Sequence, residues 1–222
     1  MERKIEICVF NIKDCINAAK YKIDRIEFCQ NRAGGGISPE KKDITEVIKL
    51  HPHIYPIIRP RKGDFIYSQS EFDAMIDLVI FCRKIGCKGV VFGILDNKNH
   101  LDIKRSKVLK QASGGMSTTF HKAFDEIEDV FEGINGLINL GFDRILTSGK
   151  SNNAINGIKL INELSEKSHN KISIMPGGGI RSNNIDEFLK NKYLREFHSS
   201  CIINNKFEES ELKRLINRIS YI

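Results

Sequence analysis

The feature that most constrains the fold of this chain is a regular alternation of short apolar runs with longer segments of helical spacing. Eight runs of four or five residues have the composition of strands. They are residues 5–9, 25–29, 55–59, 89–92, 118–121, 144–147, 172–175 and 194–198. Between them apolar residues recur every three or four positions, as at Phe72, Met75 and Val79. Ser38 followed by Pro39 fits a helix N-cap with proline at the first helical position. Strands that alternate with helices predict a parallel α/β fold.

Two architectures suit this alternation, an open doubly wound sheet and a closed (β/α)8 barrel. Residues 23–27 (IDRIE) and 142–146 (FDRIL) are similar, with a looser copy at 86–91 (GCKGVV). The 222 residues divided by eight give about 28 residues a unit, and the copies lie about two units apart. Because every unit of a barrel is equivalent, we expect a single-domain (β/α)8 barrel over residues 1–222.

Charge and composition exclude several classes of partner. The net charge is +7, from 35 Lys and Arg against 28 Asp and Glu, but the basic residues are dispersed and the chain has no Trp. That distribution is typical of a solvated surface rather than of a nucleic-acid-binding one. No apolar run approaches the ~20 residues of a membrane span. We therefore expect neither a nucleic-acid partner nor a membrane segment.

The N-terminus and the six cysteines indicate the compartment. Residues 1–4 lead directly into a strand pattern, so we expect no signal peptide. The thiols are then expected to stay reduced, in a cytoplasmic protein. The chain also lacks a phosphate-loop lysine signature and a dinucleotide fingerprint, so no nucleotide cofactor is predicted.

In a barrel, successive strand residues alternate between the interior and the surrounding helices. This alternation places charged and polar side chains inside: Glu6, Cys8, Arg25, Glu27, Cys29, Arg59, Thr119, His121, Ser148, Glu196 and His198. Buried charges need a partner or a ligand. Either they pair with one another and fill the barrel, or they line a polar pocket at its C-terminal mouth, where barrel enzymes keep their sites.

The loops after the strands favour a pocket. Arg59 and Arg61 frame a proline and predict a cationic lip for a carboxylate or phosphate. His121 ends a strand, with Lys122 and Asp125 close behind, and is a candidate general acid–base group. The loops that carry Gly178 and Gly179, and His198, Ser199 and Ser200, fall where barrels often hold phosphate.

Cys8 and Cys29 end adjacent strands on the same predicted face. Soft thiolates select Cu(I), whereas two small apolar cysteines also serve simply to fill a barrel. Both interpretations remain open on the residues alone.

Seven ordered motifs resemble those of the CutC family. They are residues 5–8 (IEIC), 24–29 (DRIEFC), 35–39 (GGISP), 58–65 (IRPRKGDF), 119–125 (TFHKAFD), 145–149 (ILTSG) and 197–200 (FHSS). The resemblance implies a TIM barrel, a cytoplasmic homodimer, and a role in copper homeostasis with Cu(I) bound through Cys8 and Cys29. The chain departs from the family pattern at Lys122, where Arg is usual, and at Lys62, Ile66 and Pro176.

Two functions follow. The first is Cu(I) binding through Cys8 and Cys29. The second is an enzyme acting on a small anionic metabolite, with Glu27 and His121 exchanging protons. In that second case the predicted ligand contacts are Arg59, Arg61, Lys122, Asp125, Ser148, Gly178, Gly179, His198, Ser199 and Ser200.

Overall fold

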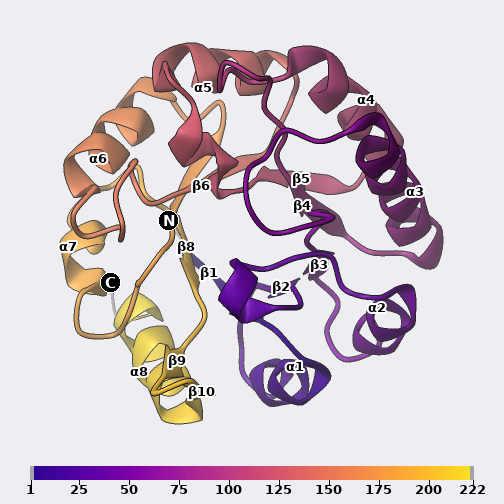
Figure 1. The fold of residues 1–222 in the computed structure, drawn as a ribbon. Coiled ribbons are helices and arrows are strands. Elements are labelled where there is room, and N and C mark those ends of the chain that lie inside the picture. Colours follow the sequence, from indigo (N-terminus) through magenta and orange to yellow (C-terminus); the bar gives the residue numbers. More distant parts are fainter. Residues whose placement is uncertain (1–2, 221–222) are drawn as a thin grey trace.

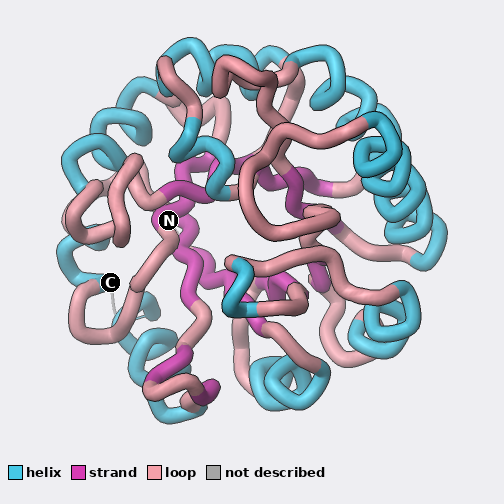
Figure 2. Tube along the Cα trace, in the orientation of Figure 1, coloured by secondary structure: helices cyan, strands magenta, loops and turns pink. Residues whose placement is uncertain are grey.

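The computed structural model describes residues 3–220, and its strands form a ring inside a ring of helices (Figure 1; Figure 2). The barrel strands are β1 (Lys4–Val9), β2 (Arg25–Phe28), β3 (Ile54–Pro56), β4 (Gly89–Phe92), β5 (Ser117–Phe120), β6 (Arg144–Thr147), β7 (Ser173–Pro176) and β8 (Glu196–Ser199). The helices are α1 (Ile12–Ala19), α2 (Lys41–Val47), α3 (Gln69–Ile85), α4 (Ile103–Ser113), α5 (Val130–Asn139), α6 (Ile158–Lys167), α7 (Ile185–Leu189) and α8 (Glu209–Ser220). Short 3-10 turns η1 (Arg32–Gly34) and η2 (Lys122–Glu126) follow β2 and β5, and a hairpin of β9 (Ile202–Ile203) and β10 (Lys206–Phe207) follows β8.

All pairings between the barrel strands are parallel, in two hydrogen-bonded sheets of order β3-β2-β1-β8 and β4-β5-β6-β7. A parallel bridge between Ile57 and Val91 joins β3 to β4, where Ile58 N donates to Val91 O at 2.7 Å. β7 and β8 lie side by side at the other seam. The ring confirms the predicted (β/α)8 barrel.

The strands sort their side chains as the alternation predicts. Ile5, Ile7 and Val9 of β1 belong to the large apolar cluster between strands and helices. Inside the barrel lies a separate small cluster, formed by Cys8, Cys29, Tyr55, Ile57, Val91 and the partly buried Phe10. The interior is therefore poor in apolar volume, and charged groups fill much of it.

An ion-pair network occupies the N-terminal half of the interior. Arg25 Nε lies 2.9 Å from Glu6 Oε2, and Arg25 also pairs with Glu196. Arg144 Nε reaches Glu196 from the opposite sheet at 3.1 Å. The Tyr55 ring stacks beneath both guanidinium groups, at 5.7 Å and 5.6 Å. The first interpretation of the buried charges thus holds for this half of the barrel, because each charge there has a partner of opposite sign.

Two local predictions are wrong. Helix α2 begins at Lys41 with Glu40 as its N-cap, so Ser38 does not cap it. The Ser38 hydroxyl instead accepts a hydrogen bond from Arg59 N at 2.7 Å. The third strand was expected to run to residue 59, but β3 ends at Pro56, since the backbone of Arg59 pairs with Ser38. None of the helices in residues 3–220 is long and apolar enough to cross a membrane.

Candidate functional site

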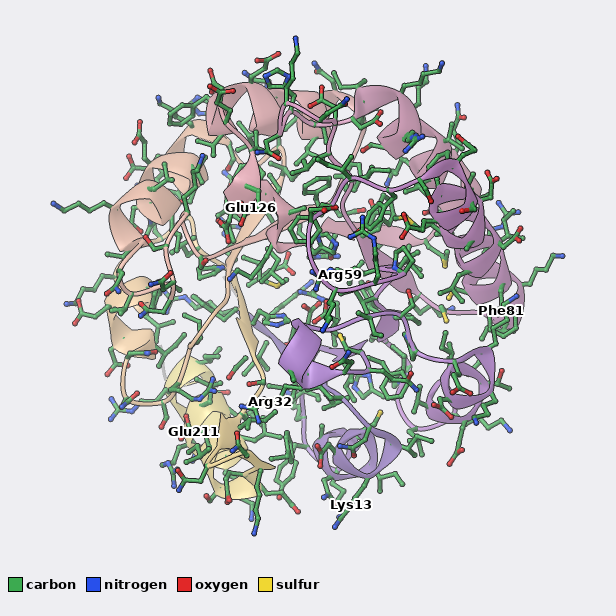
Figure 3. All side chains as sticks on the ribbon, in the orientation of Figure 1. Lys13, Arg32, Arg59, Phe81, Glu126 and Glu211 are labelled. Atoms are coloured by element: carbon green, nitrogen blue, oxygen red, sulfur yellow. The ribbon has the colours of Figure 1, made fainter. Side chains whose placement is uncertain are left out.

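A cavity of about 190 Å³ lies at the C-terminal ends of the strands. Its wall combines residues from both sheets and from the loops beyond them. They are Cys8, Phe10, Glu27, Cys29, Gly35, Ile57, Arg59, Phe65, His121, Lys122, Leu146, Gly178, Gly179, His198, Ser199 and Ser200. Arg59 lies near the middle of the ring, whereas Lys13 and Phe81 lie at its periphery (Figure 3).

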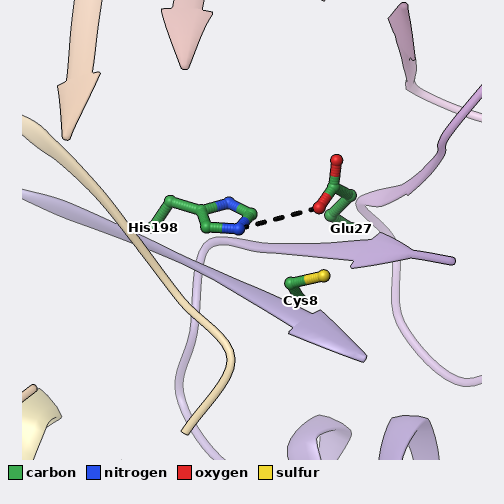
Figure 4. A group of neighbouring side chains, drawn as sticks. All are labelled: Cys8, Glu27 and His198. Atoms are coloured by element: carbon green, nitrogen blue, oxygen red, sulfur yellow. Dashed lines mark ion pairs between the residues drawn. The ribbon is translucent and has the colours of Figure 1, made fainter. Parts of the chain in front are cut away.

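Cys8, Glu27 and His198 meet at the floor of the cavity from three adjacent strands (Figure 4). Register brings them together: Cys8 pairs with Glu27 across β1 and β2, and His198 pairs with Glu6 across β1 and β8. One ligand atom from each of the three lies within 4.8 Å of the others, and all three are buried. His198 Nε2 lies 3.7 Å from Glu27 Oε2, and its Nδ1 lies 2.7 Å from Glu6 Oε1.

The two carboxyl groups at this floor differ in charge state. Burial alone would raise the pKa of Glu6, but the charge of Arg25 and the hydrogen bond with His198 lower it to about 2. Burial raises the pKa of Glu27. Burial would lower the pKa of His198, but its hydrogen bonds to Cys8 and Glu6 raise it well above the usual value. Glu6 is therefore a fixed anion that orients His198, whereas Glu27 gains and loses a proton more readily.

Two thiols share this floor. Cys8 Sγ and Cys29 Sγ lie 3.7 Å apart, at 5% and 1% exposure. The adjacent Cys29 thiol and burial raise the pKa of Cys8 well above its usual value, and burial raises the pKa of Cys29 to about 12. Both are thus protonated thiols at neutral pH. Cys8 Sγ also lies within 4.8 Å of a His198 ring nitrogen. Once the two thiols and the imidazole have lost their protons, they make a donor set that fits a soft metal ion.

Arg59 is a buried cation without a counter-charge. Its guanidinium donates to the carbonyl oxygens of Gly34, Gly36 and Gly63 at 3.1, 3.0 and 2.8 Å, and it lies 4.8 Å from the centre of the Phe65 ring. No carboxylate in residues 3–220 forms an ion pair with it, and its Nε has no hydrogen-bond partner there. The side chain is only 7% exposed. Burying a cation in this way is unfavourable unless an anion joins it.

His121 is neutral and presents an unpaired donor. Its Nδ1 accepts a hydrogen bond from Ala123 N at 3.2 Å, so Nε2 carries the proton. Burial, and the charge of Arg59, lower the pKa of His121 to about 3. Within the described residues Nε2 has no partner, although the side chain is 3% exposed. The geometry suits His121 to donate a hydrogen bond, rather than to take up a proton as sequence reasoning expected.

Glycines make room for both imidazole rings. A Cβ on Gly93 would stand 2.6 Å from His121 Nδ1. A Cβ on Gly177 would stand 2.4 Å from Leu146 Cδ1 and 3.2 Å from His198 Cδ2. A side chain at either position would therefore have to displace the neighbouring imidazole ring or Leu146.

Arg61 does not line the cavity. Its Nε lies 2.7 Å from Glu71 Oε1 and its Nη2 lies 2.8 Å from Asp64 Oδ1. It also donates to the Ile66 carbonyl at 2.8 Å and stacks on Tyr67. These bonds fix the loop that follows Arg59, so Arg61 supports the lip without facing a ligand.

Asp125 and Ser148 are also outside the cavity wall. Asp125 accepts hydrogen bonds from the Thr147 hydroxyl, from Ser148 Oγ at 2.8 Å and from Lys150 N at 3.1 Å. Ser148 Oγ also lies 2.7 Å from the Ser151 carbonyl oxygen, so its single hydroxyl proton is shared between these two acceptors. Asp125 and Ser148 therefore stabilise the turn that follows β6. The other residues named from sequence as ligand, catalytic or metal candidates all belong to the wall.

Sequence reasoning missed five wall residues: Phe10, Gly35, Ile57, Phe65 and Leu146. For three of them, the alternation of inward- and outward-facing strand residues could have predicted the position. Phe10 continues the inward series after Cys8, Ile57 precedes Arg59 in its series, and Leu146 precedes Ser148. No comparable signal existed for Phe65 or Gly35, because loop conformation places them.

A model of the CutC family matches residues 3–203 of the chain. A family protein CutC of Photorhabdus laumondii is 42% identical over 199 residues, which cover 89% of this chain and 79% of the relative. The copper homeostasis protein cutC homolog of Homo sapiens is 36% identical, over 89% of this chain and 72% of the relative. Among solved structures, a CutC protein of Streptococcus agalactiae superposes with a TM-score of 0.85 at 33% identity, over 89% of this chain and 98% of that one.

Proposed function

The chain belongs to the CutC family, and on that basis we propose that it binds Cu(I) at the cavity floor as part of copper homeostasis. Cys8 and Cys29 are the thiolate ligands in this proposal, and His198 Nε2 is the third. A human relative carries copper homeostasis in its name, which supports the metal.

The observation that carries the proposal is the pair of thiols 3.7 Å apart, one of which, Cys8, lies within 4.8 Å of a His198 ring nitrogen. Cu(I) prefers soft sulfur ligands, and imidazole suits copper as well. Glu6 accepts from His198 Nδ1, a carboxylate–histidine arrangement that fixes the ring. Because the pKa of His198 is raised, Nε2 binds the metal only after it has lost its proton.

Glu27 has a defined part in this proposal. Thiols must lose their protons to bind a metal, and a carboxyl oxygen of Glu27 lies within 4.8 Å of Cys8 Sγ. Because burial raises the pKa of Glu27, its carboxylate is a ready acceptor for a thiol proton. Glu27 then holds a proton within the cavity while Cu(I) is bound.

A Cu(I) titration against a Cu(I)-specific chelator tests the proposal. We expect Cys8→Ser/Cys29→Ser to lose at least 100-fold in affinity, and His198→Gln to lose at least tenfold. The matched control is Cys15→Ser, a buried cysteine in α1 whose side chain packs against the outer cluster. Equal affinity of wild type and double variant would rule out this site, and loss in the control would show that folding is responsible.

We also propose a reducing, cytoplasmic setting and a homodimer. All six cysteines are free thiols in the structure, which suits a reducing compartment. Cell fractionation checks the compartment, and analytical ultracentrifugation over a concentration series checks the dimer. Recovery outside the cytoplasm, or a single species of monomer mass, would contradict the respective statement.

A further inference from the structure

We propose that the upper cavity wall binds the carboxylate or phosphate group of a small metabolite, held by Arg59, Lys122 and His121. This ligand is distinct from the metal at the floor and binds to the copper-free protein. The contacts that point to it come from three separate segments of the barrel mouth.

The first contribution is the charge of Arg59. Three of its five N–H donors serve backbone carbonyls, while Nε has no partner in residues 3–220. The Tyr67 hydroxyl lies next to it, but burial raises the Tyr67 pKa to about 12, so this group stays neutral and supplies no counter-charge. Carbonyl dipoles alone leave a net positive charge at 7% exposure. An oxyanion is the ligand that compensates it, by charge-assisted hydrogen bonds.

The second contribution is the Nε2–H of His121. A buried donor left unsatisfied destabilises the folded protein, and native proteins keep few of them. Here the group is retained beside Arg59, with its tautomer set by the bond from Ala123 N and its ring packed 4.9 Å from that of Phe65. A neutral, pre-oriented N–H next to a cation is the arrangement that binds an anion without adding charge.

The third contribution is a second cation on the opposite side. Lys122 lines the cavity, and a Cβ on Gly178 would lie 3.6 Å from its Nζ. The amine therefore lies over the loop after β7, where Gly178 has a φ of +94°. Its carboxylate neighbour, Asp125, is 3.9 Å away and already accepts four other hydrogen-bond donors. The ion pair with Asp125 is therefore weak, and the Lys122 ammonium group can still attract an anion in the cavity.

The cavity limits the size of this ligand. At ~30 Å³ for each water, 190 Å³ holds roughly six waters, which matches a metabolite of a few carbons rather than a nucleotide. The charges of the wall also favour different ligands at its two ends, an anion at the upper wall and the metal ion at the floor. A free cation at the upper wall would be repelled by Arg59 and Lys122, whereas at the floor the thiolates would neutralise it.

Isothermal titration of copper-free protein, in the presence of a copper chelator, tests the inference. The probes are malonate for the carboxylate arm and glycerol 3-phosphate for the phosphate arm, with malonamide and glycerol as their uncharged counterparts. We expect at least one anion to bind with a dissociation constant below 1 mM and neither neutral probe to bind. The arm that binds more tightly identifies the anionic group.

Variants locate the site. Arg59→Met and His121→Phe are each expected to weaken the bound anion at least tenfold. Arg105→Met is the control, because this half-buried arginine of α4 donates to the Tyr67 carbonyl and does not line the cavity. If Arg59→Met fails to fold, His121→Phe and the half-exposed Lys122→Met carry the test. The inference is overturned if neither anion binds wild type at 10 mM, or if these wall variants bind as wild type does. Because copper is absent throughout, neither result depends on the proposed metal site.

Discussion

Replacing Glu6 by Gln should destabilise the protein in a pH-dependent way. Glu6 is fully buried, bonded to Arg25 at 2.9 Å and to His198 at 2.7 Å. Its pKa of about 2 lies below the ordinary 4.5. At about 1.4 kcal/mol for each tenfold change in proton affinity, the ionised carboxylate contributes about 3 kcal/mol to folding at neutral pH.

The sign follows from the lowered pKa. A carboxyl that is more acidic in the folded state stabilises the protein above its ordinary pKa of 4.5, and that contribution is lost as the pH falls towards 2. The difference in unfolding free energy between wild type and Glu6→Gln should therefore be about 3 kcal/mol at pH 7 and about 1 kcal/mol at pH 3. Urea denaturation at both pH values measures it.

Glu27→Gln is the matched variant, because it removes the same charge one strand away. Burial raises the pKa of Glu27, so its ionised form is unfavourable in the folded state. Glu27→Gln should then be neutral or stabilising at pH 7, with any gain disappearing below pH 4.5. Equal losses in the two variants, or a Glu6→Gln loss that does not change with pH, would refute the assigned charge states.

Three further predictions concern the metal, the glycines and the outer core. Apparent Cu(I) affinity should rise up to ~100-fold from pH 6 to pH 7, because the two thiols and the His198 imidazolium lose three protons and Glu27 retains one of them; chelator competition at both pH values measures this, and a flat profile would contradict thiolate binding. Gly177→Ala should cost about 1–3 kcal/mol in thermal unfolding and weaken Cu(I) binding by moving His198, whereas Gly115→Ala, with open space around it, should do neither. Phe92→Ala should cost about 3–5 kcal/mol in urea unfolding, since Phe92 is fully buried and packs on Phe142, and a loss below 1 kcal/mol would show that the outer core repacks freely.

Interior positions were predictable because strand geometry alternates strictly. The period of two places Glu6, Cys8 and Glu27 inside the barrel without knowledge of any contact. The same rule, carried one residue further, also accounts for Phe10 and Leu146. The site is therefore recoverable from sequence to the extent that strands build it.

The sequence predicted where the loops are, but not which groups their charged side chains contact. Arg61 and Asp125 carry the charges expected of ligand contacts. In the structure, both side chains instead form ion pairs or hydrogen bonds that stabilise turns. Their partners, Glu71 and Ser148, lie 10 and 23 residues away, at separations that no local pattern encodes. Ser38 fails as a helix cap for the same reason, since its hydroxyl serves the backbone of Arg59.

The order of residues along the chain determined the barrel and its inward face, because hydrophobic periodicity and repeat length are local properties that survive without tertiary contacts. The pairing of the buried charges, in contrast, depends on the closure of the two sheets into a barrel. Closure brings Arg144 to Glu196 across the interior and gives the charges at the N-terminal end partners, while Arg59 and His121 at the mouth keep unpaired donors. Electrostatic energy depends on distances between segments far apart in sequence, and the fold alone sets those distances.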